Sequence, residues 1–306
     1  CKNIDNSFLL ESVQDGTYRG RYSIIGTDPD LIWKCNNGIA YIKKIKNNES
    51  SSFIQQKDSP LISLKKVINN SKINIPKNLP PMASSLIGYL SYETIELYEK
   101  LPKRKKKPIP VPDGFFIRPT VMAIFDSIKN EVLFASPCWY TETINPEKKY
   151  LELVNKISRS INALSKSALV TKKRKKYSYI KPISNISKST FFSMINKAKK
   201  YIFEGDIFQV VLSQRFKTKF LLPPFELYRS LRSLNPSPFL FFMNFKDDKQ
   251  SSFSLIGSSP EILVKLENKK ITIRPIAGTR VRGKNAKEDM SLKKDLLSDP
   301  KELAEH

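Results

Sequence analysis

The stretch Leu31-Ile32-Trp33-Lys34-Cys35-Asn36-Asn37-Gly38-Ile39-Ala40-Tyr41-Ile42 decides the fold class of this 306-residue chain. Two apolar runs that contain β-branched and aromatic residues lie on either side of the central Asn-Asn-Gly. Asn and Gly tolerate the positive φ angles of a tight hairpin turn. The stretch therefore predicts two antiparallel strands that are joined directly to each other.

Similar patterns recur along the chain. Strands are predicted at residues 21–26, 88–92, 120–125, 207–212, 239–244, 252–256, 262–265 and 271–273, and helices at 59–69, 146–164 and 288–306. Ser187 is the expected N-cap of one more helix, which ends at Gly205. Strands outnumber crossover helices, so antiparallel pairing is expected rather than a doubly wound parallel sheet. We predict an α+β fold with an antiparallel β-sandwich core flanked by helices.

The composition changes near residue 165. From Ser165 to Ser187 the chain is rich in Lys and Ser, contains Pro182 and lacks strong hydrophobic periodicity, which is typical of a linker. We therefore predict an amino-terminal region at 1–164, a linker at 165–186 and a second region at 187–306.

The charge is strongly basic, with 53 Lys and Arg against 29 Asp and Glu and a formal net charge of +24. Such an excess could mark a nucleic-acid or membrane partner. The densest runs, Lys103–Lys107 and Lys172–Lys176, lie outside any periodic element, and no zinc-finger spacing, homeodomain-like helix or RNP-type strand is present. Solvated loops are therefore favoured. Salt-dependent binding through these runs would instead indicate a basic nucleic-acid-binding protein.

Cysteine usage and hydropathy narrow the cellular setting. The three cysteines, Cys1, Cys35 and Cys138, are far apart and form no C-x-x-C pair, so neither a disulfide framework nor a zinc site is predicted. This pattern fits a reducing compartment, and we expect a cytoplasmic protein. The longest apolar run, around Phe239–Phe242, is far too short to span a bilayer.

Four short segments of the second region carry more polar and Gly residues than plain strands or helices need. In Gly205–Arg215, Gln209 places an amide on an apolar strand, where burial would demand a hydrogen bond. An exposed position is the ordinary alternative. In Gly257–Glu261, a turn places the carboxylate of Glu261 at the start of a strand, although alone it would be a surface acid.

The other two segments suit charged ligands. In Pro275–Arg280, Gly278 allows close backbone approach and Thr279 offers a hydroxyl, which together suit an anion. A simple turn fits equally well. Glu302 and Glu305 are spaced i, i+3, so a helix places both carboxylates on one face. Such oxygens suit Mg²⁺, although a Glu pair on a helix is usually a solvated face.

Taken together in this order and spacing, the segments resemble the chorismate-utilising enzymes. The similar motifs are Gly-Asp-Ile-Phe-Gln-Val-Val-Leu-Ser at 205–213, Ser-Ser-Pro-Glu at 258–261, Arg-Pro-Ile-Ala-Gly-Thr-Arg at 274–280 and Lys-Glu-Leu-Ala-Glu-His at 301–306. Leu9–Ser12, Arg19–Ser23 and Gly88–Tyr92 look like the amino-terminal region of one group in this family, anthranilate synthase component I. The resemblance spans essentially the whole chain and implies the fold of that family.

The resemblance implies a reaction and a set of roles. In that family chorismate binds with Mg²⁺, ammonia attacks C2 as the C4 hydroxyl leaves, and loss of pyruvate gives anthranilate. Glu261 matches the acid that protonates the leaving hydroxyl. Gly278 and Thr279 match positions that contact chorismate. Glu305, with Glu302 nearby, matches the position of a metal ligand.

Two positions imply which reaction of the family is catalysed. Gln209 stands where isochorismate-forming relatives carry a Lys that activates water, so the resemblance favours ammonia as the nucleophile. Ala277 stands where aminodeoxychorismate synthases often carry a nucleophilic Lys. Anthranilate synthase, the first committed enzyme of tryptophan synthesis, is therefore favoured. Aminodeoxychorismate synthase component I of folate synthesis is the alternative.

The resemblance also implies an allosteric inhibitor and a partner subunit. In tryptophan-inhibited members the inhibitor lies between a Leu-Leu-Glu-Ser segment and an Asn-Pro-Ser-Pro segment. The corresponding positions here are Glu11, Ser12, Pro238, Phe239 and Leu240; a Pro-rich turn that feeds a strand is the plain alternative. The chain shows no Cys-His-Glu glutaminase constellation, so a separate glutamine amidotransferase subunit is the expected source of ammonia.

The end of the chain bears on its activity. In this family the catalytic domain normally continues with a Leu-Val-Asp-Leu-x-Arg-Asn-Asp stretch, a catalytic His, an Arg for a substrate carboxylate and two more metal-binding Glu. The sequence ends at His306, before these motifs, so we expect it to be truncated. This predicts that the 306-residue chain alone is poorly folded and does not turn over chorismate.

Overall fold

A computed structural model of the chain describes residues 4–14, 18–46, 49–50, 52–101, 109–139, 145–166, 180–247, 252–274 and 278–305. The chain divides into two compact units. The first, unit 1, comprises Cys1–Lys166 and Pro224–His306, and the second, unit 2, comprises Ser167–Pro223.

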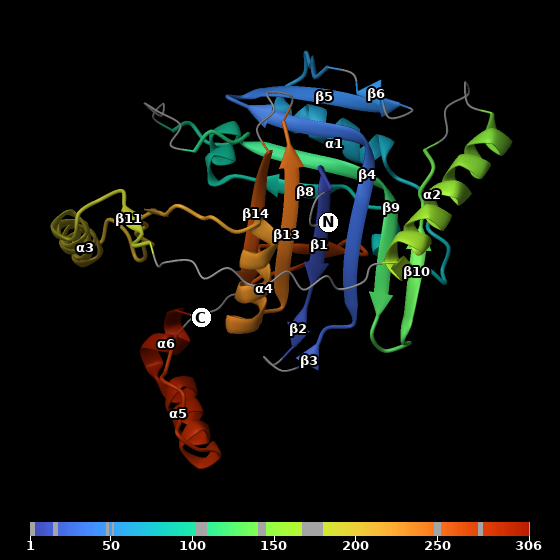
Figure 1. Ribbon diagram of the computed structural model, residues 1–306. Helices are drawn as coiled ribbons and strands as arrows, with labels where there is room; N and C mark the ends of the chain where they lie inside the picture. Colours follow the sequence, from blue (N-terminus) through green and yellow to red (C-terminus); the bar gives the residue numbers. More distant parts are fainter. Residues whose placement is uncertain are drawn as a thin grey trace. The chain divides into compact units, whose positions relative to one another are not determined.

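Unit 1 is built on one large antiparallel sheet (Figure 1). Its strand order is β10-β9-β4-β1-β13-β14. In chain order these strands are β1 (Ser7–Glu11), β4 (Tyr22–Asn36), β9 (Gly114–Asp126), β10 (Glu131–Ala135), β13 (Phe239–Lys246) and β14 (Ser252–Ser259). Strand β1 therefore joins β4 on one side to β13 on the other, although β13 lies more than two hundred residues along the chain.

Shorter strands extend or accompany this sheet. Strand β5 (Ile39–Lys46) pairs with β4, β6 (Glu49–Ser50) and β7 (Ile54–Gln55), and β8 (Ile87–Leu90) pairs with β9. Separate two-stranded ladders join β2 (Val13–Gln14) to β3 (Tyr18–Arg19) and β15 (Lys265–Glu267) to β16 (Lys270–Thr272). Every pairing is antiparallel, which confirms the predicted α+β class with antiparallel strands.

The hairpin predicted around Asn37 and Gly38 is present. Asn36 pairs with Ile39 across the turn, and Asn37 and Gly38 adopt φ angles of 51° and 74°. The strand before the turn is longer than predicted, because residues 22–26 and 31–35, expected as two separate strands, belong to one continuous strand, β4. A register shift against β9 between Pro29 and Leu31 accommodates the proline, which lacks a backbone donor.

The helices of the structure are α1 (Pro60–Asn70), α2 (Pro146–Lys166), α3 (Lys188–Phe203), α4 (Pro224–Leu234), α5 (Ala286–Ser298) and α6 (Pro300–Glu305), with 3₁₀ turns η1 (Pro81–Ala83) and η2 (Tyr92–Leu97). The predicted cap of α3 is confirmed, because Ser187 Oγ accepts a hydrogen bond from the N–H of Thr190. Gly205 follows this helix with a φ of 81°. The predicted helix 288–306 is instead two helices, separated by the extended residue Asp299.

Unit 2 contains one wrong prediction. Residues 207–212 were expected to form a strand, but they are irregular, and Phe208 is 93% exposed. In the part of unit 2 that the structure describes, the one ladder joins β11 (Ile183–Ser184) to β12 (Phe216–Lys217). Without a neighbouring strand the backbone groups of 207–212 have no ladder partner, so an apolar pattern alone does not form a strand.

The core of unit 1 lies against the long strands. Its largest cluster is aromatic and aliphatic and consists of Phe8, Ile24, Ile32, Ala83, Phe115, Ile117, Met122, Ile124, Ala135 and Phe245. A second cluster lies under α1, where buried Trp33 donates from Nε1 to Ser63 Oγ at 3.1 Å. A third cluster joins Tyr228 of α4 to Leu240 and Phe242 of β13. Helix α4 therefore packs against strand β13.

Units 1 and 2 do not coincide with the regions predicted from the sequence. Strands β13 and β14, from the predicted second region, complete the sheet of the amino-terminal region. The boundaries 1–164, 165–186 and 187–306 stay a prediction. Among the described residues, no helix has both the length and the apolar character needed to cross a membrane.

An ion pair where β9 ends and β4 begins gives a pH-dependent test of stability. Arg21 donates to buried Asp126 through Nε and Nη2, the shortest distance being 2.9 Å. The backbone N–H groups of Ile128 and Lys129 donate to the same carboxylate. The hydrogen bond from Arg21, followed by those backbone donors, lowers the pKa of Asp126 in the folded protein.

We expect Asp126→Asn to lower the unfolding midpoint near neutral pH but not in strong acid. The folded pKa is depressed, so the stabilisation is fully present above the ordinary aspartate value of about 3.9 and is lost as the pH falls through the folded value. Urea denaturation of the full-length protein at a series of pH values measures this. Asp58→Asn, which removes an exposed pair with Lys66, is the control with little effect. A midpoint difference that does not change with pH would contradict this prediction.

Candidate functional site

The predicted acid, Glu261, lies directly after β14. It follows Ser259, whose Oγ donates to the backbone oxygen of Glu261 at 3.1 Å and accepts from its N–H at 3.4 Å. Its side chain is exposed in unit 1. The structure therefore fixes the backbone at this position, while the buried setting that favours a protonated carboxyl group is not formed around it.

The predicted anion-binding pair lies close to one of the predicted metal ligands. Gly278 has a φ of 76°, and a Cβ atom there would lie 2.5 Å from Glu302 Oε2. This positive φ would strain any residue with a side chain, so the position favours glycine. The Glu302 carboxylate would also have to move to make room for a Cβ atom. Thr279 follows it and is exposed. The structure brings together Gly278 and Glu302, as the predicted site requires.

Arg280 organises the acidic groups of this segment. Its guanidinium contacts Asp295 at 2.7 Å, Asp299 at 2.7 Å and Glu302 at 3.1 Å. These carboxylates raise the pKa of Arg280, that of Asp295 having the largest effect, and Arg280 in turn lowers the pKa of Asp299. One cation therefore fixes the start of α6, which carries Glu302, against the end of α5.

The magnesium site at Glu302 and Glu305 stays a prediction. Glu302 lies on α6 but is paired with Arg280, and Glu305 ends that helix with a side chain outside the described part of the structure. Within the described ranges, no group of three or more His, Cys, Asp or Glu side chains is arranged to hold a metal ion.

Two further predicted site residues, Gln209 and Ala277, lie in unit 2 and outside the described residues, respectively. Gln209 is exposed and belongs to unit 2, whereas Glu261, Gly278 and Glu302 belong to unit 1. Ala277 lies outside the described residues, as do the basic runs Lys103–Lys107 and Lys172–Lys176.

The two segments predicted to bind tryptophan meet in the sheet. Glu11 at the end of β1 pairs with Leu240 of β13. The N–H of Val13, next to Ser12, donates to the backbone oxygen of Ser237 at 3.0 Å. Pairing between β1 and β13 thus brings Glu11 and Ser12 beside the segment that contains Pro238, Phe239 and Leu240. Phe239 is partly exposed, whereas Leu240 is buried in the α4 cluster.

Helix α4 supplies two residues here that the sequence reasoning missed. Tyr228 donates from its hydroxyl to Glu11 Oε2 at 2.5 Å, and Arg232 Nη1 donates to both carboxylate oxygens of Glu11 at 2.9 Å and 3.0 Å. Burial, and then the bond to Glu11, raise the pKa of Tyr228, while Glu11 raises that of Arg232. If residues 224–234 had been predicted as a helix, the spacing of four residues would have placed Tyr228 and Arg232 on one face.

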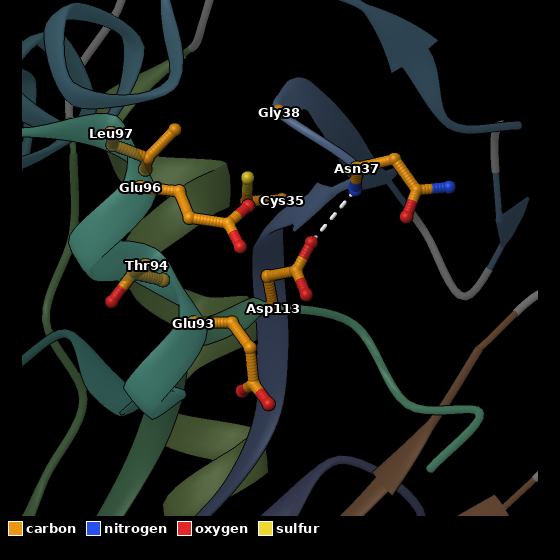
Figure 2. Close-up of a pocket in the computed structure, with 8 residues that line it drawn as sticks. All are labelled: Cys35, Asn37, Gly38, Glu93, Thr94, Glu96, Leu97 and Asp113. Carbon is orange, nitrogen blue, oxygen red and sulfur yellow. Dashed lines mark hydrogen bonds between the residues drawn. The ribbon is translucent and has the colours of Figure 1, made fainter. Parts of the chain in front are cut away.

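A small pocket lies elsewhere in unit 1, beside the β4–β5 hairpin (Figure 2). Asp113 Oδ2 accepts from the N–H of Asn37 at 2.7 Å, and the N–H of Asp113 donates to the backbone oxygen of Cys35 at 2.8 Å. Glu93, Thr94, Glu96 and Leu97 line the other side. The hydrogen bonds of Asp113 fix the hairpin turn, and none of the lining residues belongs to the predicted sites.

Comparison with known proteins defines the class. Residues 8–306 match the chorismate binding enzyme family, so the chain belongs to that family. Its sequence is 42% identical to anthranilate synthase component 1 of Cereibacter sphaeroides and 36% identical to that of Aquifex aeolicus, each over 98% of this chain.

A solved structure agrees with these relatives. The chain superimposes on anthranilate synthase component I from Streptococcus pneumoniae with a TM-score of 0.75 and 31% identity, covering 94% of this chain. This likeness confirms the fold that the sequence motifs implied. The chain spans 59% of the length of each of these three relatives.

Proposed function

We propose that this chain is the chorismate-binding part of an anthranilate synthase component I, and that it acts within a protein as long as its relatives. The observation that most strongly supports the proposal is the 42% identity over 98% of the chain to a protein of that name. The matched range contains Glu261, Gly278 and Thr279. The proposed reaction converts chorismate and ammonia to anthranilate, pyruvate and water.

The proposed steps use the residues of unit 1. Ammonia forms a bond to C2 of chorismate as the C4–O bond breaks, and Glu261 gives its proton to the departing hydroxide, which leaves as water. Removal of the C2 proton and cleavage of the enolpyruvyl C–O bond then release pyruvate and form the aromatic ring. The backbone N–H at Gly278–Thr279 and the Thr279 hydroxyl are the proposed donors to a chorismate carboxylate.

Mg²⁺ is proposed as the cofactor, with Glu305 and Glu302 among its ligands. When bound it would neutralise a substrate carboxylate and orient the ring. Support comes from the chemistry of the donors, since carboxylates on one helix face suit this hard cation. The pairing of Glu302 with Arg280 means that a cation would have to replace that contact.

The residues at positions 209 and 277 distinguish ammonia chemistry from the related reactions of the family. The neutral amide of Gln209 cannot act as a base toward water, and Ala277 has no amine that could attack the ring. Both residue identities favour anthranilate over isochorismate and 4-amino-4-deoxychorismate. Aminodeoxychorismate synthase component I stays the second candidate. Its product differs because the enolpyruvyl group stays on the ring and no pyruvate is released.

Partner and regulation complete the proposal. The name of these relatives, anthranilate synthase component 1, implies a second component. We propose that this second component is an amidotransferase that releases ammonia from glutamine. Tryptophan is proposed to bind where β1 and β13 meet, because Glu11 and Leu240 are paired there. A cytoplasmic location is proposed from cysteine usage, since neither Cys35 nor Cys138 forms a disulfide.

The 306-residue chain by itself is expected to show no chorismate turnover. Apolar side chains around the proposed site lack cover: Leu263 is 92% exposed, and β15 and β16 have no buried residue. Such exposed surface destabilises a separate domain and promotes aggregation. Anthranilate fluorescence in the presence of chorismate, ammonium and Mg²⁺ measures this, with the full-length protein as the positive control. Turnover by the 306-residue chain would refute this prediction.

The proposed function is tested by supplying the full-length protein with chorismate, Mg²⁺ and either ammonium or glutamine. We expect anthranilate with ammonium alone, and with glutamine only when the amidotransferase is added. Activity with glutamine in the absence of any partner would contradict the proposed division of labour.

A further inference from the structure

We propose that Ser258 and Ser237 couple the tryptophan site at the end of β1 to the catalytic acid Glu261. This inference rests on the function proposed above and extends it to the regulation of that site. All four positions lie in unit 1, so their contacts can be followed through one compact body.

The first link is the hydroxyl of Ser258 on β14. This residue pairs with Leu240 of β13, and its neighbour Ser259 pairs with Phe239. Ser258 Oγ donates to the backbone oxygen of Asn235 at 2.6 Å and lies 2.8 Å from Ser237 Oγ. One hydroxyl therefore holds the turn before β13 against the end of β14.

The second link is Ser237, which joins this turn to β1. Ser237 is only 6% exposed, and its backbone oxygen accepts from the N–H of Val13 at 3.0 Å. Val13 directly follows Glu11 and Ser12. A ligand that shifts the end of β1 would therefore displace the Ser237 backbone through its hydrogen bond to Val13. The contact between the Ser237 and Ser258 hydroxyls would transmit this displacement to Ser258.

The third link is the short path from Ser258 to Glu261. Ser259 Oγ bonds to both the backbone oxygen and the N–H of Glu261, and Pro260 between them has a fixed φ. The segment has little freedom to absorb a displacement of β14. A change in the Ser258 contacts would therefore move the backbone that carries the Glu261 carboxyl group.

The test uses the reciprocity of allosteric coupling in the full-length protein. If tryptophan weakens chorismate binding by some factor, chorismate weakens tryptophan binding by the same factor. Calorimetric titration of tryptophan with and without saturating chorismate and Mg²⁺, in the absence of ammonia, gives that factor. For Ser258→Ala we expect tryptophan affinity without chorismate to stay within about twofold, and the coupling factor to fall at least about fivefold.

Two further variants keep the test decisive. Ser237→Ala should also reduce coupling, and because it leaves the bond from Ser258 to Asn235 intact, it serves if Ser258→Ala fails to fold. Ser254→Ala is the matched control, since Ser254 lies on β14 and its Oγ bonds to Asn244 on β13 at 3.1 Å, away from the turn. This control should leave the coupling factor unchanged.

The outcomes separate this inference from the proposed function. If the wild-type protein does not bind tryptophan, the proposed regulatory site itself is wrong. If the wild type shows coupling and both Ser258→Ala and Ser237→Ala retain it in full, the path through these serines is overturned. Loss of tryptophan binding in Ser258→Ala without chorismate would also overturn it, because Ser258 would then contact the ligand directly.

Discussion

Replacement of Glu261 by Gln is expected to reduce ammonia-dependent anthranilate formation by the full-length protein by about 10²–10⁴-fold. Glutamine has nearly the same size and still accepts hydrogen bonds, but it has no acidic proton to give to the leaving hydroxide. The loss should fall on kcat, whereas the KM for chorismate should change only a few-fold, since the proton is transferred in the transition state. Anthranilate fluorescence measures both constants.

A nearby glutamate controls for the loss of charge. Glu267 on β15 is exposed and pairs with Lys265 at 2.7 Å, so Glu267→Gln removes the same charge without touching the proposed site. We expect its activity to stay within about twofold of the wild type, because exposed ion pairs contribute little. Retention of nearly full activity by Glu261→Gln would show that Glu261 is not the acid.

Ser12→Phe is expected to increase the tryptophan concentration needed for half-maximal inhibition about tenfold or more. The N–H of Gly20 donates to the backbone oxygen of Ser12 at 2.7 Å, and a Cβ atom on Gly20 would lie 2.5 Å from the Cβ of Ser12. Gly20 leaves no room for a phenyl ring on that side, so we expect the ring to enter the proposed tryptophan site. Activity without tryptophan should stay near that of the wild type.

Tyr228→Phe provides a milder change at the same place. It removes the hydroxyl that donates to Glu11 but keeps the ring contacts with Phe225 and Phe242, so inhibition should weaken by about fivefold. Tyr150→Phe, which alters an exposed side chain of α2, is the matched control. Undiminished inhibition of Ser12→Phe would place tryptophan elsewhere.

Local sequence signals predicted the local parts of the fold. The Asn37–Gly38 turn, the cap at Ser187 and helix α2 each depend on neighbouring residues alone, and each is present in the structure. Residues 207–212 carry the same apolar signal as a strand but are irregular, because a strand also needs a partner. Helix α4 was not predicted, although its apolar face packs on β13.

The candidate sites show the same division between local and long-range information. The helix expected around Glu302 is present, whereas Glu261, expected on a turn at the start of a strand, lies in an irregular segment between β14 and β15. The contacts of Glu11 with Tyr228 and Arg232 join residues more than two hundred positions apart, and the bond of Ser258 to Ser237 depends on the β13–β14 register. No short segment contains that information, so these contacts required the structure.

The most direct test of the proposed function is product analysis of the full-length protein supplied with chorismate, Mg²⁺ and ¹⁵N-labelled ammonium. We predict labelled anthranilate and pyruvate in equal amounts, because transfer of ammonia to C2 is followed by loss of the enolpyruvyl group. Labelled 4-amino-4-deoxychorismate without pyruvate would contradict that account and favour the folate-pathway alternative. An unlabelled product such as isochorismate would show that water, not ammonia, is the nucleophile.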